Sequence, residues 1–134
     1  MKIFTNGCFD VLHRGHLELF LYCWKLSRKA GWGEVIVGLN SDSSVLRLKG
    51  EGRPINNQED RKFFLEKIKY IDKVFIFDED TPYELIKKIQ PNIIVKGGDY
   101  KKDKVVGSDL AEVKIFKYIN GYSSTNLIAK KELW

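Results

Sequence analysis

The feature that most constrains the fold is the alternation of strand-like and helix-like segments along the chain. Five short runs rich in apolar residues have the character of β-strands, and they lie at residues 2–6, 34–40, 73–77, 92–97 and 113–118. The second run, EVIVGLN, is almost continuously apolar, which is typical of a parallel strand covered on both faces. Strands that alternate with helices predict an α/β fold with a doubly wound, five-stranded parallel sheet.

Helix-like segments fill the first three connections between these strands. The segment from Leu17 to Trp24 carries a broad apolar face and follows the first strand closely. A second helix is expected to begin at Asn56, whose side chain can cap the backbone while Glu59 reaches back in a capping box.

Two later helices have sequence signals at their first turns. The segment 81–90, TPYELIKKIQ, places Thr81 as the helix cap and Pro82 in the first turn. A closing helix is expected near the carboxyl terminus, with Ser123 or Ser124 as its cap.

The composition is that of an ordinary globular domain. Hydrophobic residues make up 43% of the chain and charged residues 31%, and no apolar stretch approaches the ~18 residues of a membrane span. The opening MKIFTNGCFD turns polar after one lysine and lacks the apolar core of a secretion signal. We therefore expect one domain over residues 1–134, located in the cytoplasm and not associated with a membrane.

The charge and the cysteines narrow the class of ligand. The net charge of +5 is spread along the chain, with lysines from Lys25 to Lys131 and no basic block with interleaved aromatic residues. This distribution favours small anionic ligands over nucleic acid. Cys8 and Cys23 are the only cysteines and have no histidine at zinc spacing, so we expect reduced thiols.

The two histidines of the chain, His13 and His16, stand together where the first strand gives way to the first helix. Ligands of such sheets bind beyond the carboxyl ends of the strands, and a helix N-terminus favours an anion. Gly7 and Gly15 permit close approach of the backbone to a ligand. The histidines can donate hydrogen bonds to phosphate oxygens and, as imidazolium, offset charge in phosphoryl transfer. The alternative is a structural pair, one histidine capping the helix and the other in the core.

The segment after the second strand is a further candidate for phosphate contacts. Residues 41–54, SDSSVLRLKGEGRP, are expected to form a loop in which Lys49, close to two glycines, folds over a triphosphate as a mobile lid. Arg47 and Arg53 lie in the same segment. The alternative is a solvated surface loop.

Two more segments reach the same edge of the predicted sheet. The fourth strand ends in KGGDY, which brings Lys96, Gly97 and Asp99 beside the first loop if the strand order is 3-2-1-4-5. The last helix begins with GYSST, which presents three hydroxyls at a second positive helix end. A glycine turn with chance charges and simple helix capping are the alternatives.

These motifs resemble a known family. TNGCFDVLHRGH resembles the opening of the nucleotidyltransferase superfamily with the HxGH signature, the cytidylyltransferase-like superfamily, and GYSST is similar to its C-terminal ISTT-type motif. NSDSSVLRLKGEGRPINNQEDR, DEDTPYELI and VKGGDY resemble the D-glycero-β-D-manno-heptose 1-phosphate adenylyltransferase domain of lipopolysaccharide precursor synthesis. The resemblance runs from Phe4 to about Ile128 and implies a Rossmann-like fold with the five strands in the order 3-2-1-4-5.

The resemblance implies transfer of AMP from ATP to a sugar 1-phosphate such as heptose 1-phosphate. An acceptor phosphate oxygen attacks the α-phosphorus in line, magnesium pyrophosphate leaves, and no covalent intermediate forms. ATP and Mg²⁺ are thus implied, with no protein side chain assigned to the metal, and so are a homodimer and a separate sugar kinase. The alternatives are a cytidylyltransferase acting on glycerol 3-phosphate or a similar ester, and a non-catalytic nucleotide-binding module.

The same resemblance implies the roles of individual residues. His13 and His16 would hold the triphosphate and stabilise the transition state, and Lys49 would grip phosphates, so these three are the predicted catalytic residues. Arg53 and Arg61 are predicted substrate contacts. Cys8 has no predicted role as a nucleophile. The predicted nucleotide and phosphate contacts are Thr5, Asn6, Gly7, Cys8, Phe9, Asp10, Gly15, Lys96, Gly97, Asp99, Ser123, Ser124 and Thr125.

Overall fold

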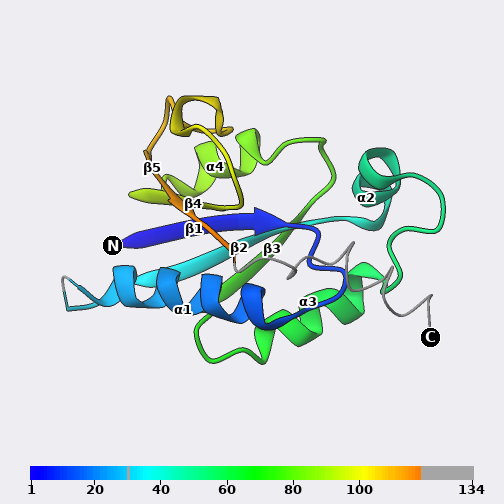
Figure 1. Cartoon of the computed structure of the whole chain (residues 1–134), viewed down its shortest axis with the longest axis horizontal. Helices are drawn as coiled ribbons and strands as arrows, with labels where there is room; N and C mark the ends of the chain where they lie inside the picture. Colours follow the sequence, from blue (N-terminus) through cyan, green and yellow to red (C-terminus); the bar gives the residue numbers. More distant parts are fainter. Residues whose placement is uncertain (30, 119–134) are drawn as a thin grey trace.

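A five-stranded parallel sheet with the strand order β3-β2-β1-β4-β5 forms the centre of the computed structural model, which describes residues 1–29 and 31–118 (Figure 1). The strands are β1 (Lys2–Gly7), β2 (Glu34–Asn40), β3 (Lys73–Phe77), β4 (Ile93–Gly97) and β5 (Glu112–Phe116). The predicted fold class, the five strands and their order are therefore confirmed.

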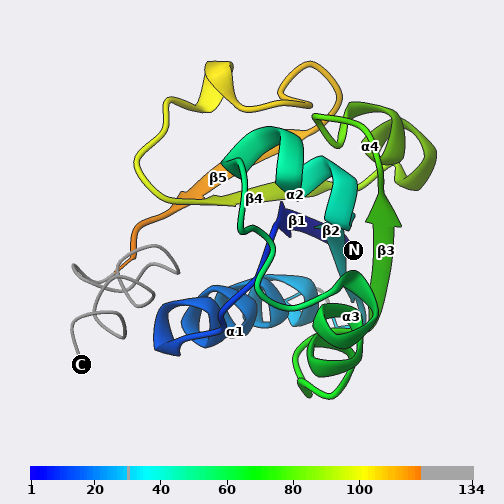
Figure 2. The ribbon, with the colours of Figure 1, turned by 90° about the vertical axis from the view of Figure 1, so that its right-hand side faces the viewer.

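Helices cover both faces of the sheet. They are α1 (Arg14–Arg28), α2 (Asp42–Lys49), α3 (Gln58–Glu66) and α4 (Tyr83–Ile89), and a 3₁₀ turn, η1, spans Lys102–Lys104. In Figures 1 and 2, α1 and α3 lie on one side of the sheet and α4 lies on the other, while α2 lies at its carboxyl edge. Successive strand residues point to opposite faces, so Ile3 packs in the α1 cluster and Phe4 in the α4 cluster.

Residues 42–49 form helix α2, so the prediction of a loop throughout 41–54 was wrong in this part. The helix has a local cause, because the Ser41 hydroxyl accepts a hydrogen bond from the Ser44 backbone N–H at 3.2 Å. Val45, on the same helix, is fully buried. Ser44 also accepts a hydrogen bond from the Asn40 amide and donates one to the Glu79 carbonyl, so α2 is held by its cap, its buried valine and bonds to neighbouring segments.

The caps of the next two helices also differ from the prediction. Asn57 rather than Asn56 caps α3, with its side chain accepting from the Asp60 N–H at 2.8 Å, because Asn56 bonds Asp10 instead. Helix α4 begins after Pro82 and has no side-chain cap, so the predicted role of Thr81 was wrong. The predicted closing helix lies outside the described residues. No helix among the described residues has the length and apolar character that a membrane span needs.

Candidate active site

An open cleft of about 560 Å³ lies at the carboxyl edge of the sheet. Strand β1 pairs with β2 as far as Gly7 but with β4 only as far as Phe4, so β1 and β4 part towards their carboxyl ends. The strand order also reverses between these two strands, which is where sheets of this type bind ligands. The predicted site residues that line the cleft are Asn6, Gly7, Cys8, Phe9, Asp10, His13, His16, Lys49, Arg53, Lys96 and Gly97.

His13 and His16 meet at the amino end of α1. His13 is the N-cap residue, and its backbone N–H donates to His16 Nδ1 at 3.3 Å. The two rings stack with their centroids 3.7 Å apart. A Cβ on Gly15 would stand 2.8 Å from the His13 ring, so the glycine of the HxGH motif is required by this stack. The pair thus shapes the helix terminus and lines the cleft at the same time.

The protonation of the histidines follows from their burial. Burial, and secondly the charge of nearby His13, lower the pKa of His16 to about 3, and burial also lowers the pKa of His13. Both rings are therefore neutral near pH 7 in the ligand-free protein, rather than imidazolium. Because His16 Nδ1 accepts a hydrogen bond, the neutral ring carries its proton on Nε2, which is left as a donor.

The loop between β1 and α1 takes an unusual turn at Phe9. Its φ of 45° lies in the left-handed region that non-glycine residues seldom adopt. The Phe9 ring packs edge-on against His16 and tilted against Phe20, with a centroid distance of 5.2 Å in each case. The hydrophobic core thus supports the loop that carries the histidines.

Asp10 ties this loop to the segment before α3. Its carboxylate is fully buried and accepts from Arg53 Nε at 2.9 Å and from the backbone N–H groups of Ile55 and Asn56 at 2.8 Å each. Burial alone would raise the pKa of Asp10, but these donors outweigh it and lower the pKa. Arg53 is thereby held at the cleft.

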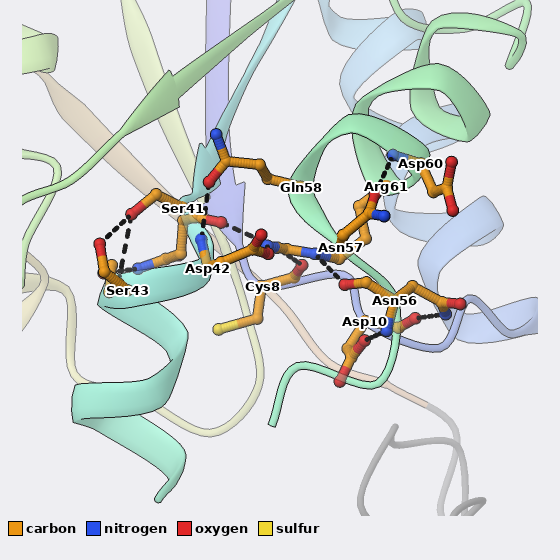
Figure 3. Close-up of polar contacts among 12 residues, drawn as sticks. Cys8, Asp10, Ser41, Asp42, Ser43, Asn56, Asn57, Gln58, Asp60 and Arg61 are labelled. Atoms are coloured by element: carbon orange, nitrogen blue, oxygen red, sulfur yellow. Dashed lines mark hydrogen bonds and ion pairs between the residues drawn. The ribbon is translucent and has the colours of Figure 1, made fainter. Parts of the chain in front are cut away.

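Arg61 lies behind the cleft wall, which corrects its prediction as a substrate contact. The residue is 2% exposed and does not line the cleft. Figure 3 shows its side chain reaching from α3 towards Cys8 and Asp42. Its guanidinium donates to four oxygen atoms. Three lie at 2.8 Å, the backbone carbonyl oxygens of Cys8 and Asn40 and Oδ1 of Asp42, and the carbonyl oxygen of Asn56 lies at 2.9 Å.

Other predicted residues lie apart from the cleft lining. Thr5 is buried within β1, and its hydroxyl has no hydrogen-bond partner among the described residues. Asp99 is exposed and does not line the cleft, so the structure does not bring it into the predicted pocket. Ser123, Ser124 and Thr125 lie outside the described residues.

Two of the lysines that line the cleft come from different elements. Lys49, at the last position of α2, is exposed and lines the cleft. From the other side, Lys96 at the end of β4 places its Nζ 4.8 Å from the centroid of the Tyr100 ring. Burial lowers the pKa of Lys96, and a bound phosphate would raise it again. Arg47 bonds Asp80 at 2.9 Å and does not line the cleft.

Several lining residues were missed by the sequence interpretation. Asp80, Thr81 and Pro82 follow β3 at the same edge of the sheet, and the rule that ligands bind beyond strand ends could have found them. Lys104 and Val105 reach the cleft from the long connection between β4 and β5. That connection has no periodic pattern, so only the folded chain brings them to the site.

Comparison with known proteins identifies the class. The family model described as cytidylyltransferase-like matches residues 4–131, and the chain belongs to this family. The predictions of HxGH-type membership and of a nucleotidyltransferase enzyme are therefore confirmed. The chain is 52% identical over 130 residues to "Bifunctional protein HldE" of Aliarcobacter butzleri and to the protein of the same name from Wolinella succinogenes. Each match covers 96% of this chain and 26% of the relative, so the chain spans about a quarter of the length of these relatives.

Solved structures show the same fold. A lipopolysaccharide core biosynthesis protein from Thermoplasma volcanium matches with a TM-score of 0.68 and 25% identity, over 92% of this chain and 98% of that one. Pantothenate synthetase from Thermus thermophilus matches with a TM-score of 0.62 over 98% of this chain and 64% of that one. At 18% identity, the second match supports the fold alone.

Proposed function

We propose that this domain transfers AMP from ATP to a sugar 1-phosphate, with heptose 1-phosphate as the acceptor, and releases pyrophosphate. The observation that carries the proposal is the stacked pair His13 and His16 in a cleft that is also lined by four cations, which are Lys49, Arg53, Lys96 and Lys104. Two neutral donors and four cationic side chains suit a triphosphate and the charge that develops as it reacts. The resemblance of DEDTPYELI and VKGGDY, together with the relatives named HldE, supports the sugar phosphate as acceptor.

Each residue has a role that follows from its chemistry. His16 donates from Nε2 to an oxygen of the α-phosphate, while its Nδ1 stays bonded to the His13 N–H. The ring is held in place before the substrate arrives, so its donor needs little reorganisation in the transition state. His13, Lys49 and Lys96 hold the phosphates, and the acceptor phosphate attacks in line. The reaction needs no protein nucleophile, and burial raises the pKa of Cys8, which keeps its thiol protonated.

Mg²⁺ enters the proposal with the nucleotide. Among residues 1–29 and 31–118, no group of three or more His, Cys, Asp or Glu side chains is placed to hold a metal ion. Mg²⁺ bound to the triphosphate oxygens of ATP would neutralise charge on the leaving pyrophosphate. The contacts proposed for Ser123, Ser124 and Thr125 rest on the GYSST resemblance alone. We also propose that residues 1–134 form a single domain, that the protein is a homodimer, and that a separate kinase supplies the sugar phosphate.

The test is pyrophosphate release by the full chain with ATP or CTP, each offered with heptose 1-phosphate, glycerol 3-phosphate and other phosphate esters. We expect the highest turnover with ATP and heptose 1-phosphate, and none without Mg²⁺. Faster turnover of CTP with glycerol 3-phosphate would replace the substrates and keep the reaction class. Nucleotide binding without pyrophosphate release on any acceptor would indicate a non-catalytic module.

A further inference from the structure

The buried guanidinium of Arg61 joins four separate segments at the cleft. Its acceptors are the carbonyls of Cys8 in the β1–α1 loop, Asn40 at the end of β2 and Asn56 before α3, together with the Asp42 carboxylate in the first turn of α2. The dashed lines in Figure 3 follow this network from α3 to the neighbouring segments. One planar group thus fixes the relative positions of four chain segments.

Stability alone is a weak reason for a charge in this place. Burying a guanidinium carries a large desolvation penalty, and well-packed apolar residues of similar volume often serve stability equally well or better. The one carboxylate that pairs with Arg61, that of Asp42, is 42% exposed, while the other three acceptors are backbone carbonyls. The specific contribution of the guanidinium is its rigid fork of donors, which sets distances and directions that a packed methyl group cannot set.

The four segments carry the residues of the proposed site. Cys8 precedes the histidines in the β1–α1 loop, and Asp42 stands at the beginning of the helix that ends at Lys49. Asn56 also donates to Asp10, which holds Arg53 at the cleft. A shift of α2 relative to the β1–α1 loop would therefore change how far Lys49 stands from the histidines.

We propose that Arg61 is a positioning residue, which places Lys49 relative to His13 and His16 so that together they hold the phosphates of one nucleotide. The proposal rests on the proposed function for its nucleotide but not for its acceptor. A lysine at this position keeps the charge, but its single nitrogen cannot reproduce the fork that reaches all four oxygens. Arg61 acts through Lys49 and needs no contact with the substrate.

The first test compares Arg61→Lys with the matched control Arg28→Lys. Arg28, in the last turn of α1, also joins two elements through its guanidinium, because it donates to Asp72 at 3.2 and 3.4 Å, but it lies outside the cleft. Calorimetry measures the Kd for ATP with Mg²⁺, at a temperature where melting curves show each variant folded. We expect Arg61→Lys to weaken binding about tenfold, the loss for roughly one charged hydrogen bond, and Arg28→Lys to leave the Kd unchanged. Equal Kd values for both variants would overturn the proposal.

The second test separates positioning from general structure. If Arg61 acts by placing Lys49, then Arg61→Lys should weaken ATP binding less than about twofold in a Lys49→Ala background, because the two changes remove one shared interaction. A full tenfold loss in both backgrounds would show independent effects and overturn the proposal. A merely structural role would give additive losses.

Asp42→Asn keeps the test decisive if Arg61→Lys does not fold. The amide retains an acceptor oxygen for Arg61, and the three carbonyl acceptors are untouched, so only one charged pairing is weakened. We expect Asp42→Asn to weaken ATP binding about threefold, and we expect this effect to disappear in the Lys49→Ala background. An unchanged Kd would overturn the proposal. A wild-type chain that binds no ATP would overturn both proposals, whereas ATP binding with no turnover on any acceptor would overturn the proposed function alone.

Discussion

The carboxyl edge of the sheet and the layers packed on its two faces differ in what they bury. Around the carboxyl edge, the described residues bury Asp10, His13, His16 and Arg61, whereas the layers on both faces of the sheet bury aliphatic and aromatic side chains such as Phe4. Burying polar and charged groups is costly unless each finds partners. The apolar layers therefore stabilise the fold, whereas the buried polar groups at the carboxyl edge lower the net stability and hold the site. Changes in the apolar layers should therefore affect folding, and changes at the edge should affect chemistry.

The largest expected effect belongs to the apolar layer. Phe4 is fully buried between the sheet and α4, and Phe4→Ala should lower the free energy of unfolding by about 3–5 kcal/mol, as expected for a large cavity. Denaturant titration measures this loss. The fraction that stays folded should keep its specific activity. A stable Phe4→Ala protein without activity would contradict the assignment of stability to the apolar layers and of chemistry to the carboxyl edge.

His16→Asn should have the opposite signature. The asparagine amide can still accept from the His13 N–H, but the donor at Nε2 is lost, so kcat should fall by roughly 10²–10³. ATP affinity should suffer less, because the interaction is made mainly in the transition state. His13→Asn should reduce both kcat and affinity. A His16→Asn protein that melts far below the wild type and keeps full activity when folded would establish a purely structural pair.

Lys49→Ala should weaken the use of triphosphate and leave the fold intact, because Lys49 is exposed at the end of α2. A loss of about 1.5–3 kcal/mol in the binding of ATP is expected for one charged hydrogen bond. The control is Lys88→Ala, which removes an exposed lysine from the last turn of α4, outside the cleft. Identical steady-state kinetics for the two variants would show that Lys49 is a solvated surface residue with no role in binding phosphate.

The last effect concerns acid stability, and near neutral pH it is the smallest of the four. His16 has a folded-state pKa of about 3, below the ordinary value of 6.5, so the unfolded chain binds a proton more readily than the folded one. The contribution of this group to stability is complete above pH 6.5 and is lost as the pH falls from 6.5 towards 3, by up to about 1.4 kcal/mol per pH unit. Urea titrations at several pH values give the free energy of unfolding, which should fall less steeply with falling pH in His16→Asn than in the wild type. An unchanged slope would mean that His16 is not desolvated.

Local signals account for the parts that could be predicted. Strands such as EVIVGLN are apolar throughout, and a parallel strand buried on both faces requires that pattern. Local chemistry cannot identify the cap of α3, because Asn56 and Asn57 have the same side chain and only the contact with Asp10 decides which of them is free to cap the helix. Helix α2 was missed because its serines and the following glycine favour a loop when the cap at Ser41 is not considered.

Residues distant in the sequence are where prediction failed. The motif around Arg61 indicates an arginine near the site but cannot say on which side of the cleft wall its guanidinium lies. Its four acceptors come from segments up to 53 residues away, and their carbonyls carry no signal in the sequence. Lys104 reaches the cleft from a connection without periodicity, for the same reason.

By itself the sequence determined the α/β class and the place of the HxGH pair, because hydrophobic periodicity and helix-terminus chemistry act over a few residues. The strand order followed from the family resemblance. Only the tertiary structure decided the protonation of His16, the position of Arg61 behind the cleft and the fixing of α2 to the β1–α1 loop. The physical reason is that desolvation and networks of hydrogen bonds depend on every segment that packs around a group. Those segments meet only in the folded chain.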